Sequence, residues 1–435
     1  MSYHIIAILG KAGKDREGNL VKSNYSKDSD LKVSGLKNGD FHNSTHCLIE
    51  SFGESATYTF LGTSDSIEFQ QNIFANLLPN SPQCKAIFEK YPPKVLGDSE
   101  IQSVFHQILE SIKSAKENNI ILDITHGFRH QPIIASFAST LGQINTQKSI
   151  TLLFAKELKP REEYQYISLE KYSQISLIAL SLQTFVQTLS VPNMGLKEPF
   201  IIALSEFSKS LHANDFNHIF ANLDKTSDEL QKAKNNAEFG GLENILDEVE
   251  KILSDFVDIK NTQKDYQKHY KIAKIMHEKG YYLIVATYIY EAIALYIIDD
   301  LSGQNLICKR GFSEYELTNA VRFYVLADIK PNDTKNGKNV FGDFAEIQAY
   351  RKNNQTKFES WKNLIGQIKT FRNDLAHISK DKKYDTKMIS GVLKRELSNL
   401  EQIINQSPTT QNINTAGNTR IEGALQECIS KLMKK

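Results

Sequence analysis

Near residue 175 the sequence changes from alternating strand and helix patterns to helical patterns alone, and this change limits the folds that the chain can adopt. Before it, short runs of β-branched and apolar residues alternate with stretches of helical spacing. The predicted strands cover residues 4–9, 56–61, 119–124 and 149–154, and two predicted helices cover residues 101–112 and 132–141. Strands that alternate with helices indicate βα units, and therefore a parallel, doubly wound, Rossmann-like sheet with helices packed on it.

Beyond residue 175 the pattern is almost purely helical. Apolar residues recur at spacings of three and four over residues 242–256, 265–301 (divided at Gly280) and 358–378. Residues 406–419 have the composition of a flexible linker, and a last helix is predicted over 421–432. We therefore expect an α/β domain over residues 1–175, a linker helix over 176–200 and an all-helical domain over 201–435.

Composition and charge exclude several classes of protein. A chain of 435 residues is too long for one ordinary core, which agrees with two domains. Lys and Arg number 52 against 51 Asp and Glu, so the chain lacks the overall positive charge typical of proteins that bind double-stranded DNA stably. The scattered cysteines indicate a reducing compartment and argue against a disulfide framework: Cys47, Cys84, Cys308 and Cys428.

The sequence also argues against a membrane protein. The most apolar segment, residues 281–301, is interrupted by Glu291 and offers no stretch of about 18 uncharged apolar residues. The first residues carry no basic region followed by an apolar one, as a signal peptide would. We expect a cytoplasmic protein, with residues 281–301 as a buried helix. Glu291 is then either a structural buried polar residue or the partner of a cation.

Three loops that follow predicted strands carry polar and glycine residues suited to a phosphate ligand. Because the carboxyl ends of parallel strands meet at one edge of a sheet, these loops are expected to form a ligand site. Neither a Walker A loop nor a dinucleotide fingerprint is present, so ATP hydrolysis and hydride transfer are unsupported. The candidate ligand-binding residues are Gly10, Lys11, Thr63, Ser64, Asp65, Ser66, Thr125, His126, Gly127, Phe128, Arg129, His130 and Gln131.

The third loop is the richest in functional groups. Arg129 can hold a phosphate with its planar fork of donors, and Phe128 can stack on a base. Thr125 and His126 can donate or accept hydrogen bonds. The alternative is a structural role, with Phe128 in the core and His126 and Arg129 as solvated loop residues.

A second candidate site lies in the helical half, at Arg372, Asn373 and His377. Histidine can move a proton near neutral pH, and arginine can stabilise the charge of a phosphorane. The pair suits cleavage of RNA without a metal, with Asn373 orienting the substrate or His377. The alternative is an Arg372 in a surface ion pair and a His377 that only ends a helix.

Two motifs resemble those of a known family. The segment from Asp123 to Arg129 (Asp-Ile-Thr-His-Gly-Phe-Arg), placed after an apolar strand, resembles the signature of CARF domains, the CRISPR-associated Rossmann fold. Arg372-x-x-x-x-His377 in a helical region resembles the HEPN ribonuclease motif. Their order resembles that of the ancillary ribonucleases of type III CRISPR systems.

The resemblance implies an activity and a set of partners. A cyclic oligoadenylate, of four or six units, would bind a CARF dimer and activate a HEPN dimer to cut single-stranded RNA. The RNA 2′-hydroxyl would attack the adjacent phosphate and leave a 2′,3′-cyclic phosphate and a 5′-hydroxyl. The implied protein is a homodimer or higher oligomer that needs no cofactor. A dimer also fits the helix geometry, because residues five apart lie roughly 140° apart around an ideal helix.

Other interpretations stay open. The CARF domain could regulate without a nuclease output, or it could cleave its own ligand as a ring nuclease, with Thr125, Lys11 or Ser64 aligning a 2′-hydroxyl. A HEPN ribonuclease could also act without an activator. The spacing His42-x-x-x-His46-Cys47 suits a metal but lacks a clear fourth ligand, so no metal is expected. Lys380 to Lys383 would either guide RNA or form a solvated turn.

Overall fold

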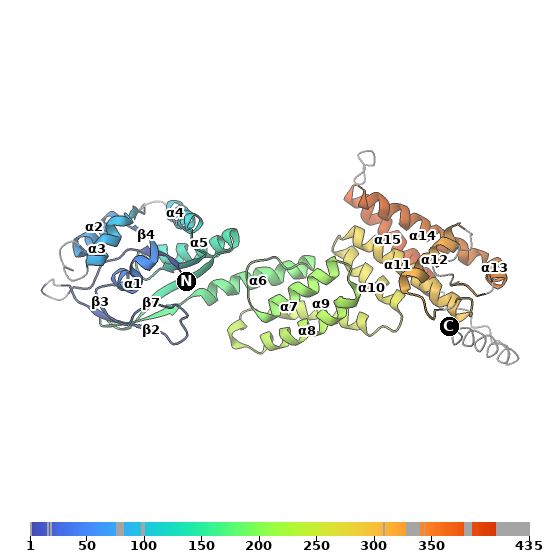
Figure 1. Cartoon of the computed structure of the whole chain (residues 1–435), viewed down its shortest axis with the longest axis horizontal. Helices are drawn as coiled ribbons and strands as arrows, with labels where there is room; N and C mark the ends of the chain where they lie inside the picture. The colour runs from blue at the N-terminus through green and yellow to red at the C-terminus, as the bar shows by residue number, and fades with distance from the viewer. Residues whose placement is uncertain are drawn as a thin grey trace, which may run out of the picture. The chain divides into compact units, whose positions relative to one another are not determined.

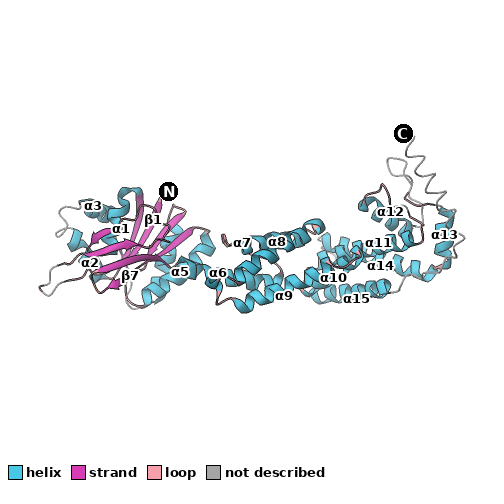
Figure 2. Cartoon of the chain, turned by 90° about the horizontal axis from the view of Figure 1, so that it is seen from below, coloured by secondary structure: helices cyan, strands magenta, loops and turns pink. Residues whose placement is uncertain are grey.

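The computed structural model describes residues 2–14, 17, 20–74, 82–96, 101–307, 309–327, 340–342, 344–377 and 385–405. The predicted linker over 406–419, the predicted last helix and the segment Lys380 to Lys383 lie outside these residues. The chain divides into two compact units, Met1–Leu253 and Ser254–Lys435. The strands belong to the first unit, and the second is helical where it is described (Figures 1 and 2).

The first unit is built on one eight-stranded mixed sheet in the order β3-β2-β8-β7-β6-β1-β4-β5. Strands β7, β6, β1, β4 and β5 run parallel, whereas β8 is antiparallel to β7 and β3 to β2. The strands are β1 (Tyr3–Ile8), β2 (Ser23–Lys27), β3 (Gly39–Phe41), β4 (Ala56–Gly62), β5 (Lys94–Val95), β6 (Asn119–Asp123), β7 (Ser149–Lys159) and β8 (Glu163–Ser168).

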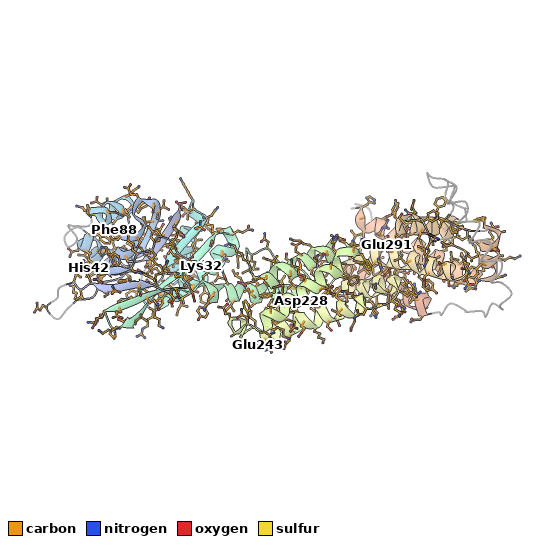
Figure 3. All side chains as sticks on the ribbon, turned by 60° about the horizontal axis from the view of Figure 1, so that its bottom comes forward. Lys32, His42, Phe88, Asp228, Glu243 and Glu291 are labelled. Carbon is orange, nitrogen blue, oxygen red and sulfur yellow. The ribbon has the colours of Figure 1, made fainter. Side chains whose placement is uncertain are left out.

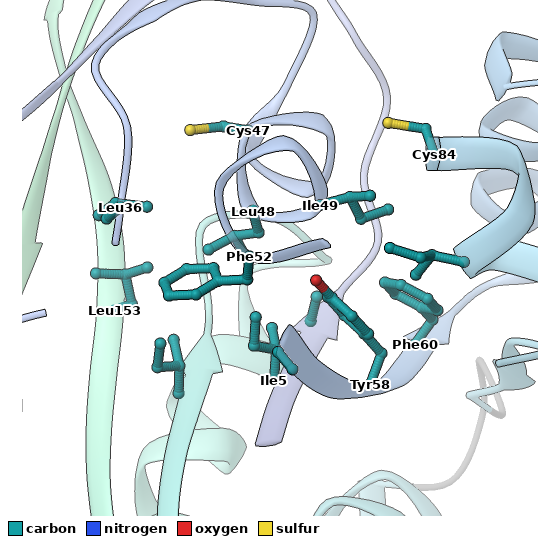
Figure 4. Close-up of a cluster of buried hydrophobic side chains, with 14 of the residues drawn as sticks. Ile5, Leu36, Cys47, Leu48, Ile49, Phe52, Tyr58, Phe60, Cys84 and Leu153 are labelled. Carbon is teal, nitrogen blue, oxygen red and sulfur yellow. The ribbon is translucent and has the colours of Figure 1, made fainter. Parts of the chain in front are cut away.

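Helices cover both faces of this sheet, as the continuous apolar run of β1 requires. Ile5 and Ala7 lie in one core cluster with residues of α1 (Ser44–Phe52) and α3 (Pro82–Lys90), part of which Figure 4 shows. Ile6 and Ile8 lie in a second cluster with residues of α4 (Ile101–Ser114) and α5 (His130–Thr146). The predicted Rossmann-like sheet is therefore confirmed.

The antiparallel edge of the sheet was not predicted. Strand β2 reads Ser-Asn-Tyr-Ser-Lys and β8 reads Glu-Tyr-Gln-Tyr-Ile-Ser, so neither has the apolar run of a central strand. Strands nearer an edge are less completely covered, and backbone pairing rather than burial holds them. Tyr25 of β2 is nevertheless buried and stacks on Tyr164 of β8 at 5.1 Å between ring centroids. Pairing and tyrosine packing define this edge, and neither produces a hydrophobic period.

The rest of the first unit is helical, from α6 (Glu170–Thr188) through α7 (Pro199–His212) and α8 (Phe216–Lys234) into α9 (Glu243–Lys260). Helix α6 begins two residues after β8 ends, close to the predicted change at residue 175. It stops at residue 188, and Pro199 then occupies the first turn of α7. Proline suits that position because its missing N–H would have no helical partner there. The functional division into domains stays a prediction.

The second unit contains helices α10 (Asp265–Glu278), α11 (Tyr282–Gly303), α12 (Glu314–Ala327), α13 (Phe344–Asn353), α14 (Gln355–Ala376) and α15 (Thr386–Asn405). Gly280, with φ +80°, separates α10 from α11, as predicted. Helix α11 is long and apolar enough to span a membrane, but 61% of its most apolar window is buried. It packs against α10, α12, α14 and α15. It is therefore the core helix of this unit, as the sequence indicated.

Candidate functional site

The three candidate loops meet at one edge of the sheet. Strand β1 lies between β6 and β4, with Ala7 opposite Asp123 and Ile8 opposite Leu61. Apart from β2 and β3, which follow β1 in the chain and lie beyond β8, the chain proceeds from β1 to β4 and β5 on one side, and then to β6 and β7 on the other. The strand order therefore reverses between β1 and β6. In open α/β sheets such a reversal leaves a crevice at the carboxyl ends of the strands, where ligands bind.

Glycines allow the loops to approach closely. A Cβ atom on Gly10 would lie 2.3 Å from Cγ of His126, so only glycine lets the first loop contact the third. Gly127 has φ +105°, and a Cβ there would lie 2.8 Å from Ile8. Both positions join β1 to the loop after β6. The sequence predicted that these glycines bind a ligand, and the structure gives each of them a packing role.

Asp123, the last residue of β6, holds the start of the third loop by hydrogen bonds. It is fully buried and accepts hydrogen bonds from Ser44 Oγ at 2.7 Å, Thr125 N at 3.0 Å and Thr125 Oγ1 at 2.5 Å. Thr125 Oγ1 in turn accepts a bond of 2.9 Å from the backbone N–H of Ala155 on β7. Thr125 is thereby held in one orientation. Burial lowers the pKa of His126, against the opposing effect of Asp123, so the imidazole is neutral near pH 7.

Three polar atoms around the crevice are buried without a hydrogen-bond partner among the described residues: Gln70 Oε1, His126 Nε2 and Gln131 Nε2. The other end of each glutamine is engaged. Gln70 Nε2 donates to Gly10 O at 2.8 Å, and Gln131 Oε1 accepts from Phe128 N at 3.0 Å. Buried unpaired polar atoms are costly, so a group of them beside a crevice favours a bound polar ligand or ordered water.

The outer part of the third loop is exposed. Phe128 is 53% exposed and stacks on His130, with 6.1 Å between ring centroids and 10° between planes. Arg129 is also exposed. The alternative that Phe128 belongs to the core is therefore wrong. An exposed Phe128 that stacks on the half-buried His130, beside an exposed arginine, can stack on a base and hold a phosphate.

The second loop has a partly structural role. Thr63 caps α2 (Ser64–Asn72), accepting a bond of 3.2 Å from Ser66 N, and Ser66 is buried. Ser64 and Asp65 are exposed, and Asp65 lies 3.8 Å from the ammonium of Lys11. Of this loop, Ser64 and Asp65 are therefore the residues with exposed side chains. Lys11 belongs to the same exposed rim.

The second candidate site lies at the end of α14. Arg372 is half-buried on the helix, and Asn373 and His377 are exposed. His377 ends the helix with an extended backbone (φ −103°, ψ 115°), and its N–H donates to Asn373 O at 2.9 Å. The angle of an ideal helix therefore does not set the direction of the His377 side chain. The expectation that a dimer completes this site therefore rests on the resemblance to HEPN ribonucleases and not on the helix angle.

Arg372 is stacked on an aromatic ring. Its guanidinium lies 4.6 Å from the ring centroid of Tyr290, a buried residue of α11. The guanidinium of Arg322 on α12 also stacks on Tyr290, at 4.0 Å. Arg322 forms an ion pair of 2.6 Å with Glu291 and donates to Tyr290 O at 3.1 Å. Glu291, labelled in Figure 3, therefore has a cation as its partner.

Comparison with known proteins bears on the domain that contains the first of these sites. Residues 5–159, about a third of the chain, match the family model described as "CRISPR system endoribonuclease Csx1, CARF domain". The chain carries a CARF domain. The match confirms the resemblance carried by residues 123–129, and it covers the part of the chain that holds the eight-stranded sheet up to the end of β7.

Two other comparisons add little. Among solved structures, Enterococcus italicus Csm6 bound to cyclic hexa-2′-fluoro-hexa-dAMP is similar over 92% of this chain and 93% of that chain, at 11% identity and a TM-score of 0.38. A score this low gives the likeness no weight. No curated protein matches the sequence.

Sequence reasoning missed several residues of these sites. Asp123 was recognised only as the start of the motif, and Gln70 carried no signal because it lies in an unremarkable helical stretch. Tyr290 and Arg322 lie far from Arg372 in sequence, and only the packing of α11, α12 and α14 brings them to it. The spacing His42-x-x-x-His46-Cys47, at which no metal was expected, did not point to Glu50 or Cys84. The CARF domain instead brings donor atoms of His46, Glu50 and Cys84 within 4.8 Å of one another.

Proposed function

We propose that this protein is a single-strand-specific endoribonuclease that its CARF domain activates on binding a cyclic oligoadenylate of four or six units. The observation that carries the proposal is the CARF domain with Phe128 and Arg129 exposed next to His130, in a chain whose helical unit holds Arg372 and His377 at the end of α14. The protein would act in the cytoplasm as part of type III CRISPR defence. Neither a metal nor an organic cofactor takes part in the cleavage.

The crevice of the CARF domain suits such a ligand. Phe128 and His130 offer stacking surfaces for adenine, and Arg129 and Lys11 offer charge to the phosphates. Near them, the unpaired Gln70 Oε1, His126 Nε2 and Gln131 Nε2 can bond to base edges or ribose hydroxyls. These groups have the chemistry of a nucleotide-binding rim.

The proposed protein is a homodimer or a higher oligomer. The face of α5 carries exposed apolar residues four apart, with Ile133 59%, Phe137 67% and Leu141 36% exposed. Such a stripe is costly in water and is typical of a surface that packs on another protein. A second copy packed there would place two third loops near one axis, as a cyclic ligand with two-fold symmetry requires.

The chemistry proposed for the helical unit is transfer of a phosphate ester within RNA. The 2′-hydroxyl gives its proton to a base and attacks the adjacent phosphorus, and the 5′-oxygen leaves with a proton from an acid. His377 acts as one of these two proton carriers. Arg372 stabilises the phosphorane, and Asn373 orients the substrate or His377. The products are a 2′,3′-cyclic phosphate and a 5′-hydroxyl.

One experiment tests the whole proposal. Purified protein is incubated with labelled single-stranded RNA and a panel of cyclic adenylates, with EDTA present. We expect cleavage with one ring size and little without ligand. Absence of cleavage with every ligand would reject the nuclease proposal and favour a CARF regulator. Equal cleavage without ligand would favour an unregulated ribonuclease, and breakdown of the cyclic ligand would favour a ring nuclease.

Tyr290 is expected to hold Arg372 in place for this reaction. Replacing Tyr290 with leucine removes the ring on which Arg372 stacks. A cation–π contact is worth about 0.5–2 kcal/mol, so its loss should lower kcat by roughly 2- to 30-fold. Phenylalanine keeps the ring and should keep most of the activity. Single-turnover kinetics should place the loss in kcat rather than KM, because Arg372 acts on the transition state.

A double-mutant cycle separates positioning from a general loss of stability. In an Arg372→Ala background, Tyr290→Leu should cost little further activity, because the residue it positions is gone. A full additional loss in that background would show that Tyr290 does not act through Arg372.

A further inference from the structure

We infer that His46, Glu50 and Cys84 form a binding site for a divalent metal of the zinc class inside the CARF domain, apart from the ligand crevice and from the proposed nuclease chemistry. One donor atom from each side chain lies within 4.8 Å of the other two. Imidazole, carboxylate and thiolate are the three ligand types that zinc takes from proteins. The site lies wholly in the first unit and joins α1 to α3.

The geometry follows from two helices. His46 and Glu50 lie four residues apart on α1 and therefore on one face, a spacing that places two ligands on one metal. Cys84 lies on α3, which packs on α1. In Figure 4 the sulfur of Cys84 points toward α1, whereas that of Cys47 points away from Cys84. Cys47 Sγ lies 3.7 Å from Lys37 O and 3.9 Å from Ser51 Oγ.

The distance between Cys84 and Glu50 is close to that of a shared metal. Cys84 Sγ lies 3.4 Å from Glu50 Oε1, in a thiol–carboxylate hydrogen bond. Zn–S and Zn–O bonds at a tetrahedral angle separate sulfur from oxygen by about 3.5 Å. A zinc ion can therefore replace the proton between the two atoms, and the proton leaves to solvent. The ion with one thiolate and one carboxylate is neutral, which suits a buried place.

His46 completes the protein ligands at a small cost. It is 4% exposed, and its Nδ1 accepts a long bond of 3.3 Å from His42 N. Metal binding through either ring nitrogen gives up that weak bond in exchange for a Zn–N bond. Cys84 is fully buried, whereas Glu50 is half-buried and provides a path from solvent. With three protein ligands, the fourth position falls to water.

The site would stabilise the base of the ligand crevice. Ser44, the first residue of α1, donates to Asp123, which holds Thr125. A metal that links α1 to α3 therefore supports the helix on which this bond depends. The expected consequence is a higher unfolding temperature of the intact chain when zinc is present, because a ligand that binds only the folded state stabilises it.

The test uses cobalt(II) and zinc on the full chain. After chelator treatment, the protein should take up about one cobalt per chain and develop a thiolate-to-cobalt charge-transfer band. Cys84→Ser should lose that band and bind zinc more than roughly tenfold more weakly. His46→Gln should weaken binding similarly. Cys47→Ser is the matched control, because its thiol lies nearby on α1 but faces other partners, and it should keep both the band and the affinity.

Two outcomes would overturn the inference. The first is a wild-type chain that takes up no stoichiometric cobalt or zinc. The second is a Cys84→Ser chain that keeps the band, which would place the metal on another cysteine. Circular dichroism of each variant guards against misfolding. Since RNA cleavage is assayed with EDTA, failure of the metal inference leaves the proposed ribonuclease untouched.

Discussion

Replacing His377 with alanine is expected to lower the rate of activator-dependent RNA cleavage by about 10²–10⁴-fold, the usual contribution of a positioned acid or base. Arg372→Ala should cause a loss of similar order, because the phosphorane would lose its charged partner. Because the two residues act on one transition state, the double variant should be little worse than either single one. Initial rates of labelled RNA cleavage at saturating activator provide the measurement.

The controls for this prediction are straightforward. His377 is exposed at the end of α14, so its replacement should change the free energy of unfolding by only about 0.5 kcal/mol or less. Affinity for the cyclic ligand should also be unchanged. His218→Ala is the matched variant, since His218 is an exposed histidine of the first unit and should keep full activity. Cleavage that survives in His377→Ala would move the catalytic site elsewhere.

The second large effect is expected at the rim of the CARF crevice. Replacing both Phe128 and Arg129 with alanine removes a stacking surface and a charged phosphate contact. Each is worth about 1–3 kcal/mol, so affinity for the activating cyclic adenylate should fall by on the order of 10²-fold or more. Calorimetric titration measures this directly, and the activator concentration for half-maximal cleavage should rise in parallel.

Conservative variants sharpen this prediction. Phe128→Trp keeps an aromatic face and should retain most of the affinity, whereas Phe128→Leu should not. Tyr172→Ala removes an aromatic residue of the same unit that is 61% exposed but lies outside the loop, and it should have no effect. If the double variant bound the activator as tightly as the wild type, the site would have to lie elsewhere on the domain.

The sequence was sufficient for the central fold. Strands β1 and β6 are almost wholly buried, and β4 and the first half of β7 are largely so, and their apolar residues carried a clear signal. Strands β2, β3 and β8 were missed because they lack an apolar run, and β2 and β8 bury the tyrosines Tyr25 and Tyr166 instead. The same reasoning placed the candidate loops at one edge, since parallel strands leave no other arrangement.

The two candidate sites differ in how far the sequence could define them. For the ligand crevice, the segment Asp123 to Arg129 is contiguous, so its composition was visible at once. Gln70, which bonds to Gly10, and Ser44, which bonds to Asp123, come from distant elements and had no local pattern. For the helical site, the spacing of Arg372 and His377 could be recognised in the sequence. The stacking of Arg372 on Tyr290 could not, because the two residues come from different helices.

The sequence by itself determined the fold class, the apolar character of α11 and the residue types offered to a phosphate ligand. These properties depend on local spacing and on burial along one element. Only the tertiary structure decided which side chains meet. Arg322 and Arg372 both stack on Tyr290, and Arg322 forms an ion pair with Glu291. The donor atoms of His46, Glu50 and Cys84 lie together, although the three residues come from two helices. The physical reason is that such contacts form between elements, where packing rather than periodicity sets the distances.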